Sequence, residues 1–120
     1  ISQIHHLNAG DSVGYNLGYT AKSNITIATL PIGHADGIGR IYGKGTGEVL
    51  IGKQMAKIVG NVCMDMIMVD ISRISCNEGD EVIIFNDDSY IAEEFTTKAG
   101  TISYELITSL SRRIKRKIIR

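Results

Sequence analysis

The chain has 120 residues, 43% of them hydrophobic and 22% charged, with 13 acidic and 13 basic side chains. This length and composition predict one domain with an ordinary core, and the zero formal charge disfavours nucleic acid or an anionic membrane as a partner. Because no apolar run approaches the ~20 residues of a membrane helix and no signal-peptide pattern opens the sequence, we expect a cytoplasmic protein.

Short runs of β-forming residues, separated by glycines, begin the chain. Residues 24–30 are rich in β-branched side chains and stop at Pro31, a pattern that predicts a strand. Residues 33–47 hold six glycines and are predicted to form a long loop. Loops on a rigid sheet often carry binding groups, so this loop is a candidate part of a site.

Further strands are predicted beyond that loop. Residues 48–51 and 55–59 are apolar runs on either side of the Gly-Lys pair at 52–53, which predicts a type II′ hairpin. Residues 62–71 read as another strand, with three methionines at alternating positions on one face. Residues 81–85 are β-branched and apolar, and they predict one more strand.

The pattern changes near the end of the chain. Residues 91–99 carry acids early and a lysine late, with Gly100 just beyond them, which predicts a helix. Residues 103–110 have apolar residues at helical spacing and predict a second, shorter helix. About six short strands followed by two short helices predict a mainly β fold. We expect a small β-barrel or sandwich rather than a doubly wound α/β fold.

Four short motifs follow one another along the chain. They are AGDSVGY at residues 9–15, LPIGHADG at 30–37, NVCMDMIMVD at 61–70 and GTISYE at 100–105. Each motif alone is a weak signal, but the ordered set resembles the C-terminal domain of alanine racemase, an enzyme that depends on pyridoxal phosphate. The resemblance extends from about residue 9 to residue 116, nearly the whole chain.

The resemblance implies that residues 1–120 are the C-terminal β-domain of a longer enzyme that interconverts L-alanine and D-alanine for peptidoglycan synthesis. It implies a head-to-tail homodimer, in which an N-terminal TIM-type barrel binds pyridoxal 5′-phosphate covalently through a lysine. A TIM barrel needs ~200 residues or more, so this chain has no room for one. The first residue is Ile1 rather than methionine, which agrees with a fragment. The isolated chain is therefore expected to be inactive.

Tyr15 is the candidate catalytic residue. Taken alone, it is most simply a half-buried tyrosine in a glycine-flanked turn. A phenol titrates near ~10, so a role near neutral pH requires a cationic or hydrogen-bonding neighbour, and none is adjacent in the sequence. The resemblance implies that Tyr15 is one of two catalytic bases, facing a cofactor held by the partner subunit. Gly14 and Asn16 depart from the usual Ser and Gly, which we interpret as a local variation of the turn.

The Cys-Met-Asp triplet at 63–65 has two interpretations. Alone, it is a strand end with a solvated aspartate. The resemblance implies that the backbone N–H of Met64 contacts the substrate carboxylate and that Asp65 shapes the same site. A main-chain donor suits this task because its dipole is fixed beforehand. Cys63 has no basic neighbour in the sequence, so we expect a small buried hydrophobe rather than a nucleophile.

Three more residues gain roles from the resemblance. It implies that Tyr104 hydrogen-bonds the cofactor phosphate, with Ser103 where the family has Asn; alone, Tyr104 is a packing tyrosine. His34 stands where the family usually has a tyrosine at the inner entrance to the active site. An imidazole is smaller and can be charged near neutral pH, although a packing histidine is an equal alternative. Arg40 matches an entrance arginine, or else is a surface salt-bridge partner.

Metal and nucleic-acid sites are disfavoured. Two cysteines 13 residues apart, without a CxxC pattern or a histidine at ligand spacing, do not predict zinc. The adjacent histidines at 5–6 lack further ligands. Residues 111–120 include six basic residues, but no aromatic residue is interleaved, and residues 78–94 balance them with seven acids.

Two other functions stay open on the sequence alone. One is a racemase or decarboxylase of the same fold type III that acts on another amino acid, because contacts to the substrate side chain would come largely from the absent barrel. The other is a non-catalytic β-barrel interaction module that retained the motifs. A barrel with a pyridoxal-binding lysine, encoded directly upstream, would favour the enzyme.

Overall fold

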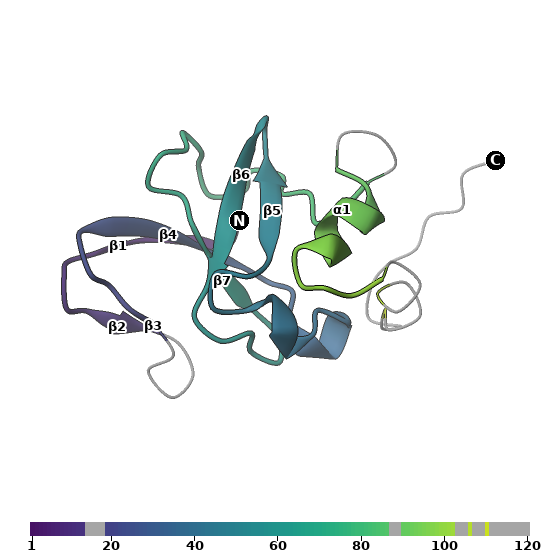
Figure 1. Ribbon diagram of the computed structural model, residues 1–120. Helices are drawn as coiled ribbons and strands as arrows, with labels where there is room; N and C mark the ends of the chain where they lie inside the picture. Colours follow the sequence, from purple (N-terminus) through teal and green to yellow (C-terminus); the bar gives the residue numbers. More distant parts are fainter. Residues whose placement is uncertain (14–18, 87–89, 103–105, 107–109, 111–120) are drawn as a thin grey trace.

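The structure is a computed structural model, and it describes residues 1–13, 19–86, 90–102, 106 and 110. Within them, five strands form an antiparallel sheet in the order β1-β4-β7-β6-β5, and two more form a small ribbon, β2-β3 (Figure 1). The strands are β1 (Gln3–Leu7), β2 (Ser12–Val13), β3 (Tyr19–Thr20), β4 (Ile25–Leu30), β5 (Glu48–Ile51), β6 (Gln54–Val59) and β7 (Ile67–Asp70). The helical elements are the 3₁₀ turns η2 (His34–Asp36) and η3 (Arg40–Tyr42) and helix α1 (Ala92–Thr97).

The mainly β class is confirmed, but the main sheet is open. Among the described strands, β1 and β5 lie at its two edges and do not pair with each other. The strand predicted for residues 24–30 is β4, which pairs with β1 on one side and β7 on the other. "Barrel" is therefore too specific a term for the described sheet.

The predicted hairpin is present as β5 and β6, in which Ile51 pairs with Gln54. Gly52 has a φ of 61°, whereas Lys53 is not among the described residues with positive φ. This is the pattern of a type II′ turn, in which the first central position takes glycine. The hairpin was predictable because its turn and its strands are encoded within a dozen consecutive residues.

One predicted strand is shorter than expected, and another is absent. The strand expected over residues 62–71 is ordered as β7 only from Ile67, because the residues before it bond to the loop at 33–36 instead of to a neighbouring strand. Residues 81–85 form no strand; Ile83 makes a single antiparallel bridge with Leu50. Helix α1 confirms the first predicted helix, and the second falls mostly outside the described residues.

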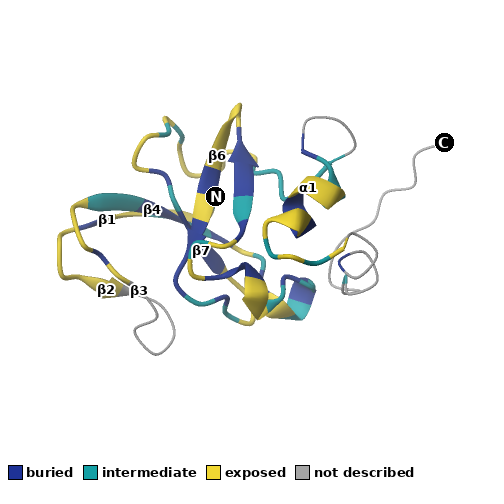
Figure 2. Ribbon diagram, in the orientation of Figure 1, coloured by how far each residue is buried: buried dark blue, intermediate teal, exposed yellow. Residues whose placement is uncertain are grey.

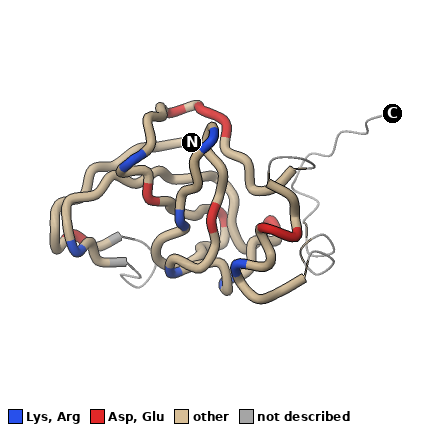
Figure 3. The backbone as a smooth tube through the Cα atoms, turned by 45° about the horizontal axis from the view of Figure 1, so that its top comes forward, with Lys and Arg blue, Asp and Glu red and all other residues tan. Residues whose placement is uncertain are grey.

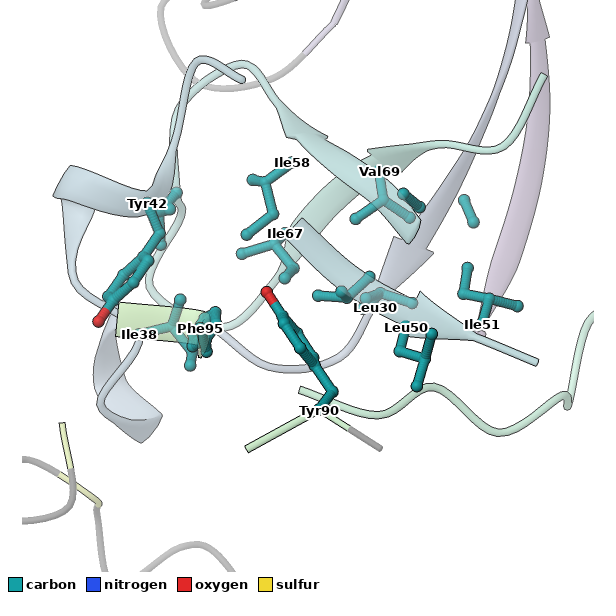
Figure 4. Close-up of a cluster of buried hydrophobic side chains, with 14 of the residues drawn as sticks. Leu30, Ile38, Tyr42, Leu50, Ile51, Ile58, Ile67, Val69, Tyr90 and Phe95 are labelled. Carbon is teal, nitrogen blue, oxygen red and sulfur yellow. The ribbon is translucent and has the colours of Figure 1, made fainter. Parts of the chain in front are cut away.

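Helix α1 covers the core beside β5, with its acidic residues exposed and its inner side buried (Figure 2). Phe95 is fully buried, and its ring stacks on Tyr42 with centroids 4.5 Å apart. Tyr90 meets Phe95 edge-on at 6.2 Å, and its hydroxyl donates to the Glu48 carbonyl at 2.9 Å. Burial, with the Glu48 carboxylate, raises the pKa of Tyr90 far above its usual range, so the hydroxyl remains a donor. Figure 4 shows these rings beside the aliphatic core.

The surface of the described chain carries both signs of charge. Basic and acidic side chains occur on the sheet and on the loops around it (Figure 3). The described helices include none that is both long and apolar enough to cross a membrane. The basic segment at 111–120 lies outside the described residues.

Candidate functional site

The loop at residues 33–36 and the turn at residues 63–66 lie against each other at one end of the sheet (Figure 1). The N–H groups of His34 and Ala35 donate to the carbonyl oxygens of Cys63 and Met64, both at 2.8 Å. The Cys63 N–H donates to the carbonyl of Met66 at 3.1 Å, which closes a turn just before β7. The LPIGHADG and NVCMD motifs are therefore parts of one site.

Gly33 and Asp36 fix the loop at residues 33–36 in its place against the turn. A Cβ atom at Gly33 would lie 2.3 Å from the Cys63 oxygen and 2.9 Å from the Met64 carbonyl carbon, so the close approach requires glycine. The buried Asp36 carboxylate accepts the Gly33 N–H at 3.0 Å. Asp36 is a site residue that the motifs did not predict, although an acid at this offset from the start of a helical turn has the capping-box spacing.

An open pocket of about 440 Å³ lies between the two segments and is lined by His34, Arg40, Val62, Cys63 and Met64. His34 and Arg40 are exposed and approach it from η2 and η3, whereas Cys63 and Met64 belong to the turn. A guanidinium group at the pocket favours an anionic ligand, and the geometry of arginine matches both carboxylate and phosphate.

Three of the six predicted site residues line this pocket, namely His34, Arg40 and Met64. Asp65 is exposed and follows Met64 in the turn, but it does not line the pocket. Tyr15 and Tyr104 lie outside the described residues, so their place relative to the pocket stays a prediction.

The carbonyl of Met64 is hydrogen-bonded, but no partner is described for its N–H. Its carbonyl accepts the Ala35 N–H, whereas its own N–H makes no hydrogen bond within the described part of the chain. Met64 is 64% exposed, and the Asp65 carboxylate likewise has no hydrogen-bond or ion-pair partner among the described residues. The turn therefore has a main-chain donor without a partner among the described residues, in a residue that lines the pocket.

Two of the four motifs thus meet at one site, and a comparison with known families agrees with the ordered set of four. The family model described as "Alanine racemase, C-terminal domain" matches residues 1–118. The chain belongs to this family. The match confirms the resemblance inferred from the motifs, and it spans all the predicted site residues of the alanine racemase C-terminal domain.

Curated alanine racemases are similar to the chain over nearly its whole length. The enzyme of Vesicomyosocius okutanii is 40% identical over 114 residues, and that of Clostridium tetani is 38% identical over 125. These matches cover 95% and 100% of this chain but 32% of each relative. The chain spans about a third of the length of the curated relatives it matches.

Solved structures of alanine racemases share the fold. The alanine racemase of Clostridium difficile 630, in complex with cycloserine, aligns with a TM-score of 0.84 and 42% identity over 95% of this chain and 30% of that chain. The alanine racemase from Bartonella henselae, with covalently bound pyridoxal phosphate, aligns with a TM-score of 0.89 and 34% identity over 98% of this chain and 33% of that chain. The observed sheet is thus that of an alanine racemase C-terminal domain.

The remaining histidines and cysteines do not form a second centre. No group of three or more residues suited to bind a metal ion occurs among the described residues. His6 contacts the Thr26 hydroxyl at 2.9 Å. Burial raises the pKa of the Cys76 thiol, with a further increase from Asp80, so this cysteine remains protonated. Cys63 is half-buried rather than buried, and its thiol lies 3.8 Å from the Asn61 carbonyl.

Proposed function

We propose that the chain is the C-terminal domain of an alanine racemase, which interconverts L-alanine and D-alanine for peptidoglycan synthesis. The observation that carries the proposal is the family match over residues 1–118. The length of the relatives supports the assignment of residues 1–120 to one domain of a longer enzyme. In this proposal the N-terminal barrel of the enzyme is a separate domain.

The substrate carboxylate is proposed to bind at the turn. The open N–H of Met64 donates to a carboxylate oxygen, and the peptide dipole needs no reorganisation when the substrate arrives. Asp65, adjacent and exposed, shapes the polar edge of this site. His34 and Arg40 line the approach, where the guanidinium group attracts the carboxylate of an amino acid.

Tyr15 is proposed to hold and move the α-proton. Racemisation requires one base on each face of the α-carbon, so that one removes a proton and the other returns one. In this proposal the phenolic oxygen of Tyr15 serves one face, and a lysine of another subunit's barrel serves the other. Pyridoxal phosphate, when bound, supplies the electron sink that makes the α-proton acidic.

The donor set of the described pocket fits a role in anion binding rather than in covalent attachment of the cofactor. An N–H group, a guanidinium group and an imidazole suit carboxylate or phosphate oxygens, but no described lysine lines the pocket. We therefore assign the covalent lysine to the N-terminal barrel. Within this chain, Tyr104 is proposed to donate its hydroxyl to the cofactor phosphate.

The exposed apolar side chains near the pocket support a partner domain. Ile41 is 51% exposed, Met64 64% and Met66 40%. Met64 lines the pocket, and Ile41 and Met66 lie one and two residues along the chain from lining residues. Exposed apolar groups beside a polar site are typical of a surface that another domain covers. The proposed occupant is the barrel of a second subunit in a homodimer.

The two alternatives remain proposals of lower rank. A racemase or decarboxylase for another amino acid is not separated from an alanine racemase by this domain, whose pocket recognises a carboxylate common to all amino acids. A non-catalytic module would retain the turn and the loop without any need for Tyr15.

The test is racemisation by the whole protein and by the isolated chain, each with added pyridoxal phosphate. We expect the whole protein to form D-alanine from L-alanine and the isolated chain to form none, because the chain lacks the second base and the covalent lysine. Other L-amino acids, offered in parallel, distinguish the first alternative. Turnover by the chain, after removal of any host racemase, would contradict the proposal, as would an inert whole protein.

Replacing Tyr104 by phenylalanine in the whole protein is expected to weaken cofactor binding. Loss of one hydrogen bond to a charged phosphate costs about 1.5–3 kcal/mol. The dissociation constant of pyridoxal phosphate, measured after reversible removal of the cofactor, gives the effect. Tyr90→Phe deletes the same atom from a hydroxyl that bonds Glu48 in the core, so it should leave this constant unchanged. Equal constants for the wild type and the Tyr104 variant would refute the phosphate contact.

A further inference from the structure

The open N–H of Met64 is the last group in a chain of hydrogen-bonded peptides. It belongs to the same planar peptide unit as the Cys63 carbonyl, and that carbonyl accepts the His34 N–H at 2.8 Å. The His34 N–H belongs in turn to the peptide of the Gly33 carbonyl, which accepts the Asp36 N–H at 2.9 Å. Hydrogen bonds therefore link three peptide groups head to tail, and the chain ends at the N–H of Met64, a residue that lines the pocket.

This alignment has two physical consequences for the Met64 N–H. A peptide unit is planar, so a carbonyl fixed at one end also fixes the direction of the N–H at the other. Each hydrogen bond also polarises the next in such a chain, by about 10–30% per bond. The donor is therefore both oriented and strengthened before any ligand binds.

We propose that Gly33 and the main-chain N–H of His34 are positioning residues for carboxylate recognition. Gly33 provides the close approach, since a Cβ there would lie 2.3 Å from the Cys63 oxygen. The His34 N–H then holds that oxygen and so aims the Met64 N–H. This inference rests on the proposed function, in which the Met64 N–H contacts the substrate carboxylate, and it assigns His34 a role that is independent of its imidazole.

Two variants at one position separate the N–H of His34 from its side chain. His34→Ala removes the imidazole and keeps the N–H, whereas His34→Pro removes both. The fixed φ of proline suits His34, the first residue of η2. Its ring carbon replaces the hydrogen that bonds the Cys63 oxygen, so the loop and the turn must also move apart in this variant. Gly33 before it is extended, with φ −158° and ψ −154°, so it lies outside the α region that a following proline disfavours.

The measurements are made on the whole protein. We expect His34→Pro to raise the KM for alanine about ten-fold relative to His34→Ala, as for a weakened hydrogen bond to a charged group, with a smaller change in kcat. The dissociation constant of acetate, a probe with only the carboxylate, should rise by a similar factor. In protein labelled with ¹⁵N-methionine, acetate should shift the Met64 amide signal in the alanine variant more than in the proline variant.

A second pair of variants guards against a general loss of stability. Gly33→Ala is compared with Gly47→Ala, whose Cβ would lie 2.8 Å from the carbonyl oxygen of Tyr42, a residue that does not line the pocket. Both variants should lower the melting temperature, but only Gly33→Ala should weaken acetate binding. If it lowers stability alone, as Gly47→Ala does, the positioning role is refuted.

Acetate binding also separates this inference from the proposed function. Suppose that the whole protein has no racemase activity, but that acetate shifts its Met64 signal and this shift is lost in His34→Pro. That result supports the positioning role and refutes the proposed function. Equal KM values and equal acetate constants for His34→Pro and His34→Ala overturn the inference, even if the enzyme racemises alanine. So does the absence of any acetate-dependent shift at Met64 in the unmodified protein.

Discussion

Replacing Tyr15 by phenylalanine in the whole protein is expected to slow the removal of the α-proton from L-alanine by about 10²- to 10⁴-fold, the usual contribution of one acid–base group. The substitution deletes only the oxygen that would carry the proton. Cofactor binding should stay intact, because no cofactor contact is proposed for this oxygen. The effect should be directional, since the base on the other face still removes the α-proton of D-alanine.

Exchange of the α-proton with solvent deuterium measures the two directions separately. L-alanine and D-alanine are incubated in turn with the variant in deuterated buffer, and the loss of the α-proton signal gives each rate. Tyr90→Phe, which removes a hydroxyl in the core rather than near the pocket, is the matched control and should exchange both isomers at the wild-type rate. Wild-type exchange of both isomers by the Tyr15 variant would remove the catalytic assignment.

Replacing Phe95 by alanine is expected to destabilise the domain by about 3–5 kcal/mol, the range for truncating a large aromatic side chain in a core. Phe95 has no exposed surface and contacts three rings, stacking on Tyr42 and Phe85 and meeting Tyr90 edge-on. Removal of the Phe95 ring leaves a cavity between α1 and the sheet, and the three neighbouring rings cannot fill it.

Urea unfolding of the chain measures this effect. Ile102→Ala is the matched control, because Ile102 is 65% exposed and a surface truncation should change the free energy of unfolding by no more than about 0.5 kcal/mol. If Phe95→Ala lowers the free energy of unfolding by less than about 1 kcal/mol, α1 does not depend on this ring for its packing.

The elements predicted from the sequence are those encoded locally. The strand at 25–30, the hairpin around Gly52 and helix α1 each carry their pattern and their end signals within a few residues. Strand β1 was not predicted, because QIHHL has no alternation of apolar and polar residues. Its pairing with β4 makes it a strand, and that partner lies about twenty residues away.

The methionine triplet shows where local patterns fail. Alternation predicted a strand with Met64, Met66 and Met68 on one face, yet only Met68 is buried and in β7. The two others belong to a turn, in which the carbonyl groups of Cys63 and Met64 accept N–H groups of the loop 29 residues earlier. No local signal encodes such a contact. The motifs nevertheless identified the right segments, since His34, Arg40 and Met64 share one pocket.

The aspects of the site that the sequence could not supply are geometric. The motifs contain Gly33 and Cys63, but they do not say that a side chain at the first would strike the carbonyl of the second. They contain Asp36, but not its hydrogen bond to the Gly33 N–H. Both facts arise only when the two motifs meet, and both concern the main chain rather than the side chains that a motif displays.

In the proposed enzyme, this chain supplies its tyrosine to an active site built on another subunit, and subunit mixing tests this arrangement directly. One inactive parent carries Tyr15→Phe, and the other lacks the covalent lysine of its barrel. If the tyrosine and the lysine of each site come from different subunits, a mixed dimer contains one site with both groups intact. Racemase activity should then return when the two inactive proteins are dissociated, combined and reassociated. Activity that stays at the level of the separate parents, with mixed dimers shown to be present, would contradict the account.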